Sequence, residues 1–235
     1  MRSPLANFRS LLSGLFFISY GLAALPFALV LTLPIWNGRS LRFVVRWFYR
    51  VFVFFARLTR LYRVELDATT RAALANCRGK IIVANHLSLI DICILMAYLP
   101  DSTAIAKSAA KRNPFLSMVV RKIFILNDGE PTETVARATA LIKKGVNIIV
   151  FPQGTRGGAG LKRGAARLAL AAAVPIATFH LAYEPLILAK GQPWWDVGNR
   201  EIKIRLSYRG ECAAMGKDNH HEAVQLTAYI GEKIK

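Results

Sequence analysis

Cysteine and histidine are scarce in this sequence of 235 residues. The three cysteines (Cys77, Cys93 and Cys212) have neither metal-like nor redox-like spacing, and none of the four histidines pairs with a cysteine or carboxylate at zinc-ligand spacing. The sequence therefore argues against a zinc protein and a disulfide scaffold. We expect no metal, and we expect the cysteines to act as small apolar residues in a reducing compartment.

Acidic residues are also few, with 14 Asp and Glu against 32 Lys and Arg, which gives a net charge of +18. Because 54% of the residues are hydrophobic, the chain does not have the low hydrophobicity that disorder requires. A basic and apolar protein suits an anionic bilayer, where each Lys or Arg contributes about 1 kcal/mol. Nucleic acid is the other polyanion, but the chain has no nucleic-acid-binding motif and its apolar excess lies in one terminal block. We therefore expect anionic membrane lipids as partners, and no nucleic acid.

Charge is absent from one long stretch, between Arg9 and Arg39. A bilayer crossing needs roughly 20 apolar residues, and a signal peptide has a shorter apolar region of about 7–15. Pro26 divides the stretch into Leu11–Leu25 and Phe27–Trp36, so the pattern is compatible with one kinked crossing and with a re-entrant segment. More arginines follow the stretch than precede it. If it spans the membrane, the positive-inside rule places the rest of the chain in the cytoplasm, at the inner membrane.

The segment from Ser40 to Arg60 combines arginine with aromatic residues. Its arginines fall within an arc of roughly 80° on a helix: Arg42, Arg46, Arg50, Arg57 and Arg60. We expect an amphipathic helix in the headgroup plane with its arginines toward lipid phosphate. The alternative is a helix that packs on the core with a solvated basic face. Residues 1–61 are accordingly expected to be membrane-associated.

From about residue 62 to residue 235, short β-rich runs alternate with helical ones, which predicts βαβ units. The predicted strands are Tyr62–Leu66, Lys80–Ala84, Thr103–Ala106, Ile123–Leu126, Val146–Phe151, Ile176–His180 and Ile202–Tyr208. The predicted helices are Asp67–Asn76, Leu89–Leu99, Pro114–Arg121, Thr132–Lys143, Gly164–Ala172 and Asn219–Glu232. The fold class is therefore α/β, with a mostly parallel mixed sheet flanked by helices and preceded by the membrane-associated segment.

A polar segment, Asn85–Asp91, joins a predicted strand to a predicted helix. His86 and Asp91 cannot share one helical face, since five residues rotate by about 140°. They can meet if His86 lies in the loop and Asp91 in the first turn, with Ser88 as the N-cap. Such a pair can act as a base and its orienter. The alternative is that Ser88 and Asp91 form only a capping box.

A second polar segment, Phe151–Gly158, follows another predicted strand. Its glycines let backbone N–H groups approach an anion, and Arg156 can bind phosphate through two parallel hydrogen bonds. Lys162 and Arg163 follow, just before a helix whose N-terminus also favours anions. The pattern predicts a phosphate site, and a solvated glycine-rich turn is the alternative.

Together, Asn-His-x-Ser-x-x-Asp at 85–91 and Phe-Pro-x-Gly-Thr-Arg at 151–156 resemble the signatures of the glycerolipid acyltransferase family, whose type member acylates lysophosphatidic acid (1-acylglycerol-3-phosphate). The resemblance runs from about Lys80 to Ile176. It implies an enzyme in which His86 is the general base and Asp91 orients it. It also implies a substrate-binding set: Asn85, Ser88, Lys107, Gln153, Gly154, Thr155, Arg156, Lys162 and Arg163.

By the same resemblance, the partners are a lyso-lipid acceptor and a thioester of acyl carrier protein or coenzyme A, which is a co-substrate; no cofactor is implied. Three positions depart from the family pattern. Gln153 stands where glutamate is usual, and the Ala109-Ala110 pair stands where Glu-Leu is frequent. In the middle block, Arg121 stands at a glycine position and Asn127 where a phosphate-binding arginine is usual. The acceptor can therefore be lysophosphatidic acid or a related lyso-lipid. The alternative function is a drifted, non-catalytic lipid-binding or scaffold member of the family.

Overall fold

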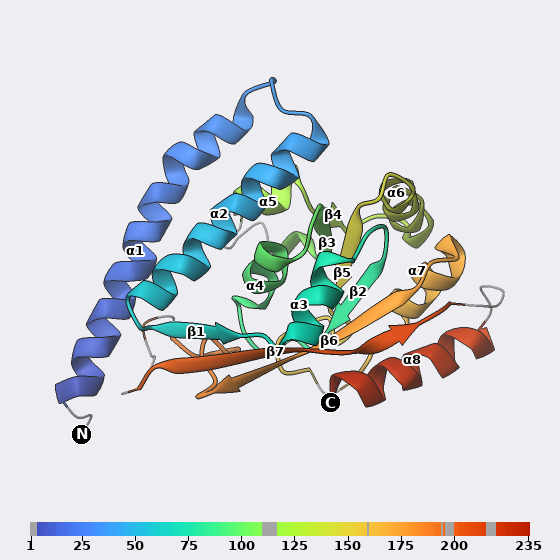
Figure 1. Cartoon of the computed structure of the whole chain (residues 1–235). Helices are drawn as coiled ribbons and strands as arrows, with labels where there is room; N and C mark the ends of the chain where they lie inside the picture. Colours follow the sequence, from blue (N-terminus) through green and yellow to red (C-terminus); the bar gives the residue numbers. More distant parts are fainter. Residues whose placement is uncertain (1–3, 110–116, 159, 194, 196–199, 215–219) are drawn as a thin grey trace.

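The computed structural model describes residues 4–109, 117–158, 160–193, 195, 200–214 and 220–235, and it is built on a sheet (Figure 1). In this part of the chain the sheet has seven strands in the order β1-β7-β6-β2-β5-β3-β4. Their bounds are β1 Tyr62–Glu65, β2 Ile81–Ala84, β3 Ser102–Ala106, β4 Ile125–Leu126, β5 Asn147–Val150, β6 Ile176–Glu184 and β7 Ile202–Cys212. All neighbours are parallel except β6 and β7, which are antiparallel. The prediction of a mostly parallel mixed sheet is confirmed.

Helices connect and cover the strands. Their bounds are α1 Pro4–Thr32, α2 Gly38–Leu58, α3 Ala68–Ala75, α4 Asp91–Tyr98, α5 Ser117–Lys122, α6 Pro131–Lys143, α7 Gly164–Ala172 and α8 His220–Ile234. Residues 114–116 and 219, which belong to two of the predicted helices, lie outside the described residues. The prediction that α4 begins with Ser88 as its N-cap is wrong. The N-cap is Ile90, and within the described part of the chain the Ser88 hydroxyl accepts only from the N–H of Ile90 itself, at 3.5 Å.

The sheet has a buried core on each face. β2 illustrates this, because its residues alternate between the two cores: Ile82 and Ala84 pack with α2 and α4, and Ile81 and Val83 pack with α6, α7 and α8. All four are fully buried, as expected of a parallel strand covered on both faces. This explains why the strand is a continuous apolar run rather than an alternating one.

The N-terminal segment forms one long helix, α1, that runs alongside α2 (Figure 1). Pro26 does not end the helix but lies inside it, as in the first of the two arrangements that the sequence left open. Proline removes one helical hydrogen bond, and the helical bonds on either side carry the helix past it. Residues Asn7–Leu31 are long and apolar enough to cross a bilayer, and little of that window is buried. The exposed apolar side chains of α1 include Leu5, Phe8, Leu11, Leu15, Ile18, Leu22, Leu25 and Leu29.

Helix α2 has three faces. One is buried on the body, one carries the arginines, and the third exposes Phe43, Trp47, Phe54 and Leu58. Part of the basic face is directed inward, contrary to the expectation that it points to lipid. The Arg42 guanidinium pairs with Asp101, and Arg46 donates to the Tyr98 carbonyl, at 3.1 Å, and to the Ala97 carbonyl, both at the C-terminal end of α4. These contacts fasten α2 to the α/β body.

The carboxyl ends of β2, β5, β3 and β4 meet at one edge of the sheet, because these four strands are parallel neighbours. Ala84 leads into His86, Val150 into Phe151, Ala106 into Lys107, and Leu126 into Asn127. Both polar segments of the sequence therefore arrive at the same edge, where open α/β sheets bind ligands.

Candidate active site

The central contact of the site is between His86 and Asp91. The His86 Nδ1 atom lies 2.8 Å from the Asp91 Oδ2 atom, and the Asp91 side chain is fully buried whereas that of His86 is 19% exposed. A carboxylate at this position favours the tautomer with the proton on Nδ1, which leaves the Nε2 atom as a hydrogen-bond acceptor. The predicted meeting of a loop histidine with a first-turn aspartate is thus what the structure contains.

The Asp91 carboxylate also organises the loop around it. Its Oδ2 atom accepts hydrogen bonds from the backbone N–H groups of Leu87, at 2.7 Å, and Ser88, at 2.9 Å. Its Oδ1 atom accepts one from the hydroxyl of Tyr183, on β6. The orienting contact and the capping-type contact, which the sequence left as alternatives, are made by the same carboxylate.

The second polar segment holds the backbone of His86 on both sides. The side-chain oxygen of Gln153 accepts from the His86 N–H at 2.6 Å, and the Gly157 N–H donates to the His86 carbonyl at 2.8 Å. The Phe151 ring stacks on the imidazole, with ring centroids 4.2 Å apart. Gln153 therefore keeps the one acceptor that this position needs, although it lacks the charge of glutamate.

Gly154 lies under the side chain of Lys162. Its φ of +67° is in the left-handed region, and a Cβ atom there would lie 3.2 Å from the Lys162 Cε atom. The Lys162 N–H donates to the Pro152 carbonyl at 2.8 Å, which folds the loop back on itself. Arg156 is anchored by a 2.7 Å bond from its guanidinium to the Leu188 carbonyl. The loop conformation thus presents two cations from different parts of one segment.

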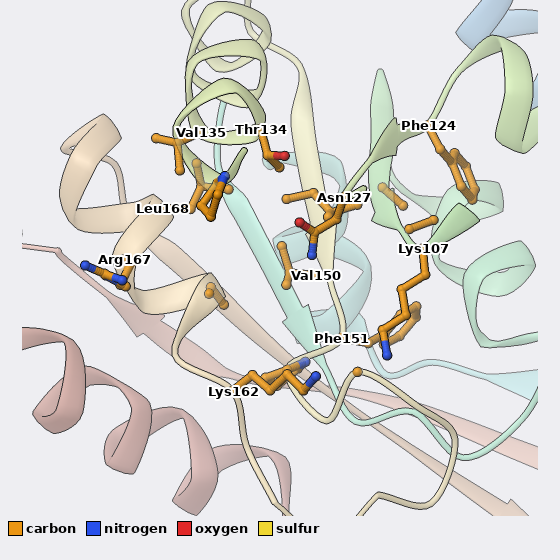
Figure 2. Close-up of a pocket in the computed structure, with 18 of the residues that line it drawn as sticks. Lys107, Phe124, Asn127, Thr134, Val135, Val150, Phe151, Lys162, Arg167 and Leu168 are labelled. Carbon is orange, nitrogen blue, oxygen red and sulfur yellow. The ribbon is translucent and has the colours of Figure 1, made fainter. Parts of the chain in front are cut away.

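These groups border a cavity of about 1260 Å³ at the carboxyl edge of the sheet. In Figure 2, Lys107, Lys162 and Phe151 lie toward one end of it, and Thr134 and Val135 on α6 toward the other. The cations that line it are here called the cationic cluster: Lys107, Arg156, Lys162, Arg163 and Arg167. Its apolar lining includes Leu89, Ile92, Ala104, Val120, Phe124, Val135, Val150 and Leu168. The cavity is thus lined by a histidine, by positively charged side chains and by apolar side chains.

The predicted site residues divide into two groups. His86, Lys107, Gly154, Arg156, Lys162 and Arg163 line the cavity. Within the described part of the chain, the residues that line it do not include Asn85, Ser88, Gln153 or Thr155. The buried Asn85 amide instead exchanges two hydrogen bonds with the Leu181 backbone, at 2.7 and 2.8 Å, and ties the loop to β6. Whether any of these residues contacts a substrate stays a prediction.

Sequence reasoning missed Tyr183 and Arg167, which belong to neither motif. Neither side chain has a sequence signal of its own, because a tyrosine in a strand and an arginine in a helix are ordinary residues. Among the described residues, the structure contains no group of three or more His, Cys, Asp and Glu side chains arranged to hold a metal ion.

The similarity to known proteins covers the part of the chain that carries the two polar segments. The family model described as Acyltransferase matches residues 65–182, half of the chain. A 1-acyl-sn-glycerol-3-phosphate acyltransferase of Cocos nucifera is 32% identical over 107 residues, which cover 41% of this chain and 35% of that protein. A 1-acyl-sn-glycerol-3-phosphate acyltransferase beta of Homo sapiens is 27% identical over 147 residues, which cover 57% of this chain and 50% of that protein. The chain thus spans half or less of the length of the curated relatives it matches.

The fold has a solved counterpart. The crystal structure of the 1-acyl-sn-glycerophosphate (LPA) acyltransferase PlsC from Thermotoga maritima superposes with a TM-score of 0.74 over 98% of this chain and 95% of that chain, at 22% identity. This likeness establishes the fold, including a counterpart for the N-terminal helices. Together with the match over residues 65–182, it leads to one conclusion: the chain belongs to the acyltransferase family.

Proposed function

We propose that this protein is an O-acyltransferase that moves a fatty acyl group from acyl-ACP or acyl-CoA to the free hydroxyl of a lyso-lipid, either lysophosphatidic acid or a close relative of it. The observation that carries the proposal is the His86–Asp91 contact of 2.8 Å at the wall of a cavity that also holds the cationic cluster. Two relatives whose names specify acylation of a glycerol phosphate support it.

The chemistry follows from the position of the imidazole. Nε2 of His86 takes the proton of the lyso-lipid hydroxyl as the hydroxyl oxygen attacks the thioester carbonyl carbon. The tetrahedral intermediate collapses with cleavage of the C–S bond, and the thiolate receives the proton from the imidazolium. Asp91 stabilises the imidazolium between the two steps and keeps the ring oriented. The products are an ester and a free thiol, and the base is regenerated.

The other parts of the cavity suit the two substrates. The cationic cluster provides the charge that an acceptor phosphate requires, and the apolar wall provides a surface for an acyl chain. Arg156 is the strongest candidate for the phosphate ligand, because its guanidinium is planar and one of its nitrogens is already fixed to the Leu188 carbonyl.

The N-terminal helices suit a membrane-bound enzyme on the cytoplasmic face of the inner membrane. The exposed apolar faces of α1 and α2 adjoin the exposed arginines of α2, such as Arg50 and Arg57, and this combination binds anionic bilayers. Such placement would hold the enzyme at the membrane that contains its lyso-lipid acceptor.

The test is a panel of lyso-lipid acceptors with both thioester donors, with products detected by mass spectrometry. Wild-type protein should form a diacyl product, and His86→Ala should lower kcat by at least about 10³-fold while retaining the wild-type circular dichroism spectrum. His221→Ala is the matched control, since His221 is an exposed histidine on α8. Saturable lyso-lipid binding without turnover of any acceptor would instead support the lipid-binding or scaffold role.

A further inference from the structure

One group at the site is used by neither sequence motif: the hydroxyl of Tyr183. It donates a hydrogen bond to the Asp91 Oδ1 atom, across 92 residues of sequence. Burial of the hydroxyl, and the Asp91 charge beside it, raise the pKa of Tyr183 well above its usual range. The phenol is therefore a neutral hydrogen-bond donor at neutral pH.

Tyr183 reaches Asp91 because strand β6 extends past the end of the neighbouring strand β2. β2 ends at Ala84, which pairs with Phe179, whereas β6 runs on to Glu184. Alternation along the strand puts Phe179, Leu181 and Tyr183 in the core on the α4 side of the sheet. Asn85 clamps the loop to Leu181, two residues before Tyr183, so the strand and the loop are held in one register.

The Tyr183 hydroxyl is the hydrogen-bond donor to one of the two oxygens of the Asp91 carboxylate. Oδ2 faces His86 Nδ1 and two backbone N–H groups, all on the side of the loop. Oδ1 faces Tyr183. Because Asp91 is fully buried, an Oδ1 atom without a donor would be a desolvated anionic oxygen, and the carboxylate would rotate or draw in water to recover a partner.

We propose that Tyr183 is a positioning residue for the general base: its hydroxyl fixes the plane of the Asp91 carboxylate and, as the donor to Oδ1, disperses part of the negative charge that faces the His86 imidazole. The proposal rests on the proposed acyl transfer for its kinetic consequences. Its geometric part, the orientation of Asp91 and hence of the imidazole, does not depend on turnover.

Tyr183→Phe tests the proposal, since it removes the hydroxyl and keeps the ring. We expect kcat to fall about 10- to 100-fold, the loss typical of one hydrogen bond to a buried charge, with little change in the KM of either substrate. A carboxylate that is no longer shared with a phenol holds the imidazolium more strongly. The acidic limb of the pH–rate profile should therefore move to higher pH. Tyr208→Phe is the matched control, because Tyr208 lies on the adjacent strand β7 in contact with Phe179 and away from Asp91.

A spectroscopic measurement separates this proposal from the proposed function. In the folded protein, the His86 Nδ1 proton and ring carbons should change NMR shift in Tyr183→Phe and not in Tyr208→Phe, whether or not any acceptor turns over. If the wild type shows no turnover but this shift is seen, the proposed function fails and the positioning role stands. If kcat and the pH profile of Tyr183→Phe match the wild type, or if kcat falls with no movement of the acidic limb and no NMR change, the proposal is overturned.

A second variant covers the case in which Tyr183→Phe does not fold. Placing 3-fluorotyrosine at position 183 keeps the size and hydrogen bond of the side chain and makes the hydroxyl a stronger donor. The acidic limb should then move to lower pH, opposite to the change expected for phenylalanine. A shift in the same direction as phenylalanine, or no shift, contradicts the proposed sharing of charge.

Discussion

Two regions of the site satisfy their polar groups in opposite ways. In the base segment, Asn85–Asp91, the amide of Asn85, the backbone of His86 and the carboxylate of Asp91 all have partners within the protein. In the cationic cluster, by contrast, the Lys107 and Lys162 side chains are exposed at the wall of the cavity, although Arg156 is bonded to the Leu188 carbonyl and Arg163 to His220. The difference indicates that the geometry of the base is set by folding, and we expect the two exposed lysines of the cluster to gain a partner only when a ligand binds. Substitutions in the base segment should therefore change kcat, and those in the cluster should change KM.

The largest effect is expected for Asp91→Asn. Asparagine can keep its oxygen toward the Leu87 and Ser88 N–H groups and its amide toward Tyr183, so the fold should persist. The imidazolium loses its counter-charge, and we expect kcat to fall about 10³- to 10⁴-fold, the scale of the same exchange in a Ser-His-Asp triad. Steady-state kinetics at saturating acceptor and donor provides the measurement.

Asp91→Ala is the comparison for stability. It leaves two N–H groups in the buried loop without their acceptor, which costs about 1–3 kcal/mol each in the free energy of unfolding. Urea unfolding should thus separate the two variants although both are nearly inactive. Equal stability of the alanine variant and the wild type would contradict the view that the Asp91 carboxylate organises the loop.

A smaller effect of a different kind is expected for Lys162→Met. Methionine keeps an apolar chain over Gly154 and removes only the charge. With a phosphorylated lyso-lipid we expect KM to rise about tenfold at nearly unchanged kcat, the lower end of the loss for one hydrogen bond to a charged group.

Two controls define this result. Lys143→Met removes an exposed lysine in the last turn of α6, outside the residues that line the cavity, and should leave KM unchanged. An acceptor of the same chain length without a phosphate should show no difference between Lys162→Met and the wild type. A fall in kcat with unchanged KM would place Lys162 with the base segment and end the contrast between the two regions.

The sequence predicted those parts of the molecule that are encoded within a few residues. Each predicted strand is present, α7 has the predicted bounds, and His86 meets Asp91, because apolar runs and loop motifs are local patterns. The contact of Tyr183 with Asp91 could not be predicted, since it depends on how far β6 extends past β2.

The N-terminal helices illustrate the same limit. The arc of arginines on α2 predicted a single basic face, but Arg42 finds Asp101 and Arg46 finds the end of α4, and these partners are 59 and about 50 residues away. A helical wheel describes which side chains share a face and not what lies opposite them. Pro26 illustrates a related limit, because the sequence left open whether the helix continues past this residue, and the structure has it continue.

The smallest effect is expected at Gln153, where the two regions touch. Its side-chain oxygen accepts from the His86 N–H at 2.6 Å, so Gln153→Ala leaves that N–H without this acceptor. The opposite side of His86 is still held by the Gly157 N–H, and the loss should therefore be that of one neutral hydrogen bond, about 2- to 10-fold in kcat.

Gln153→Glu keeps the acceptor and should have kcat close to the wild-type value. It also places a negative charge on the loop that carries Arg156, so KM for a phosphorylated acceptor should rise modestly, and this rise should disappear with an acceptor that lacks phosphate. Measuring both variants against both acceptors tells whether Gln153 belongs to the base segment through its hydrogen bond or to the cationic cluster through its neighbours. A loss in Gln153→Ala confined to KM would assign it to the cluster.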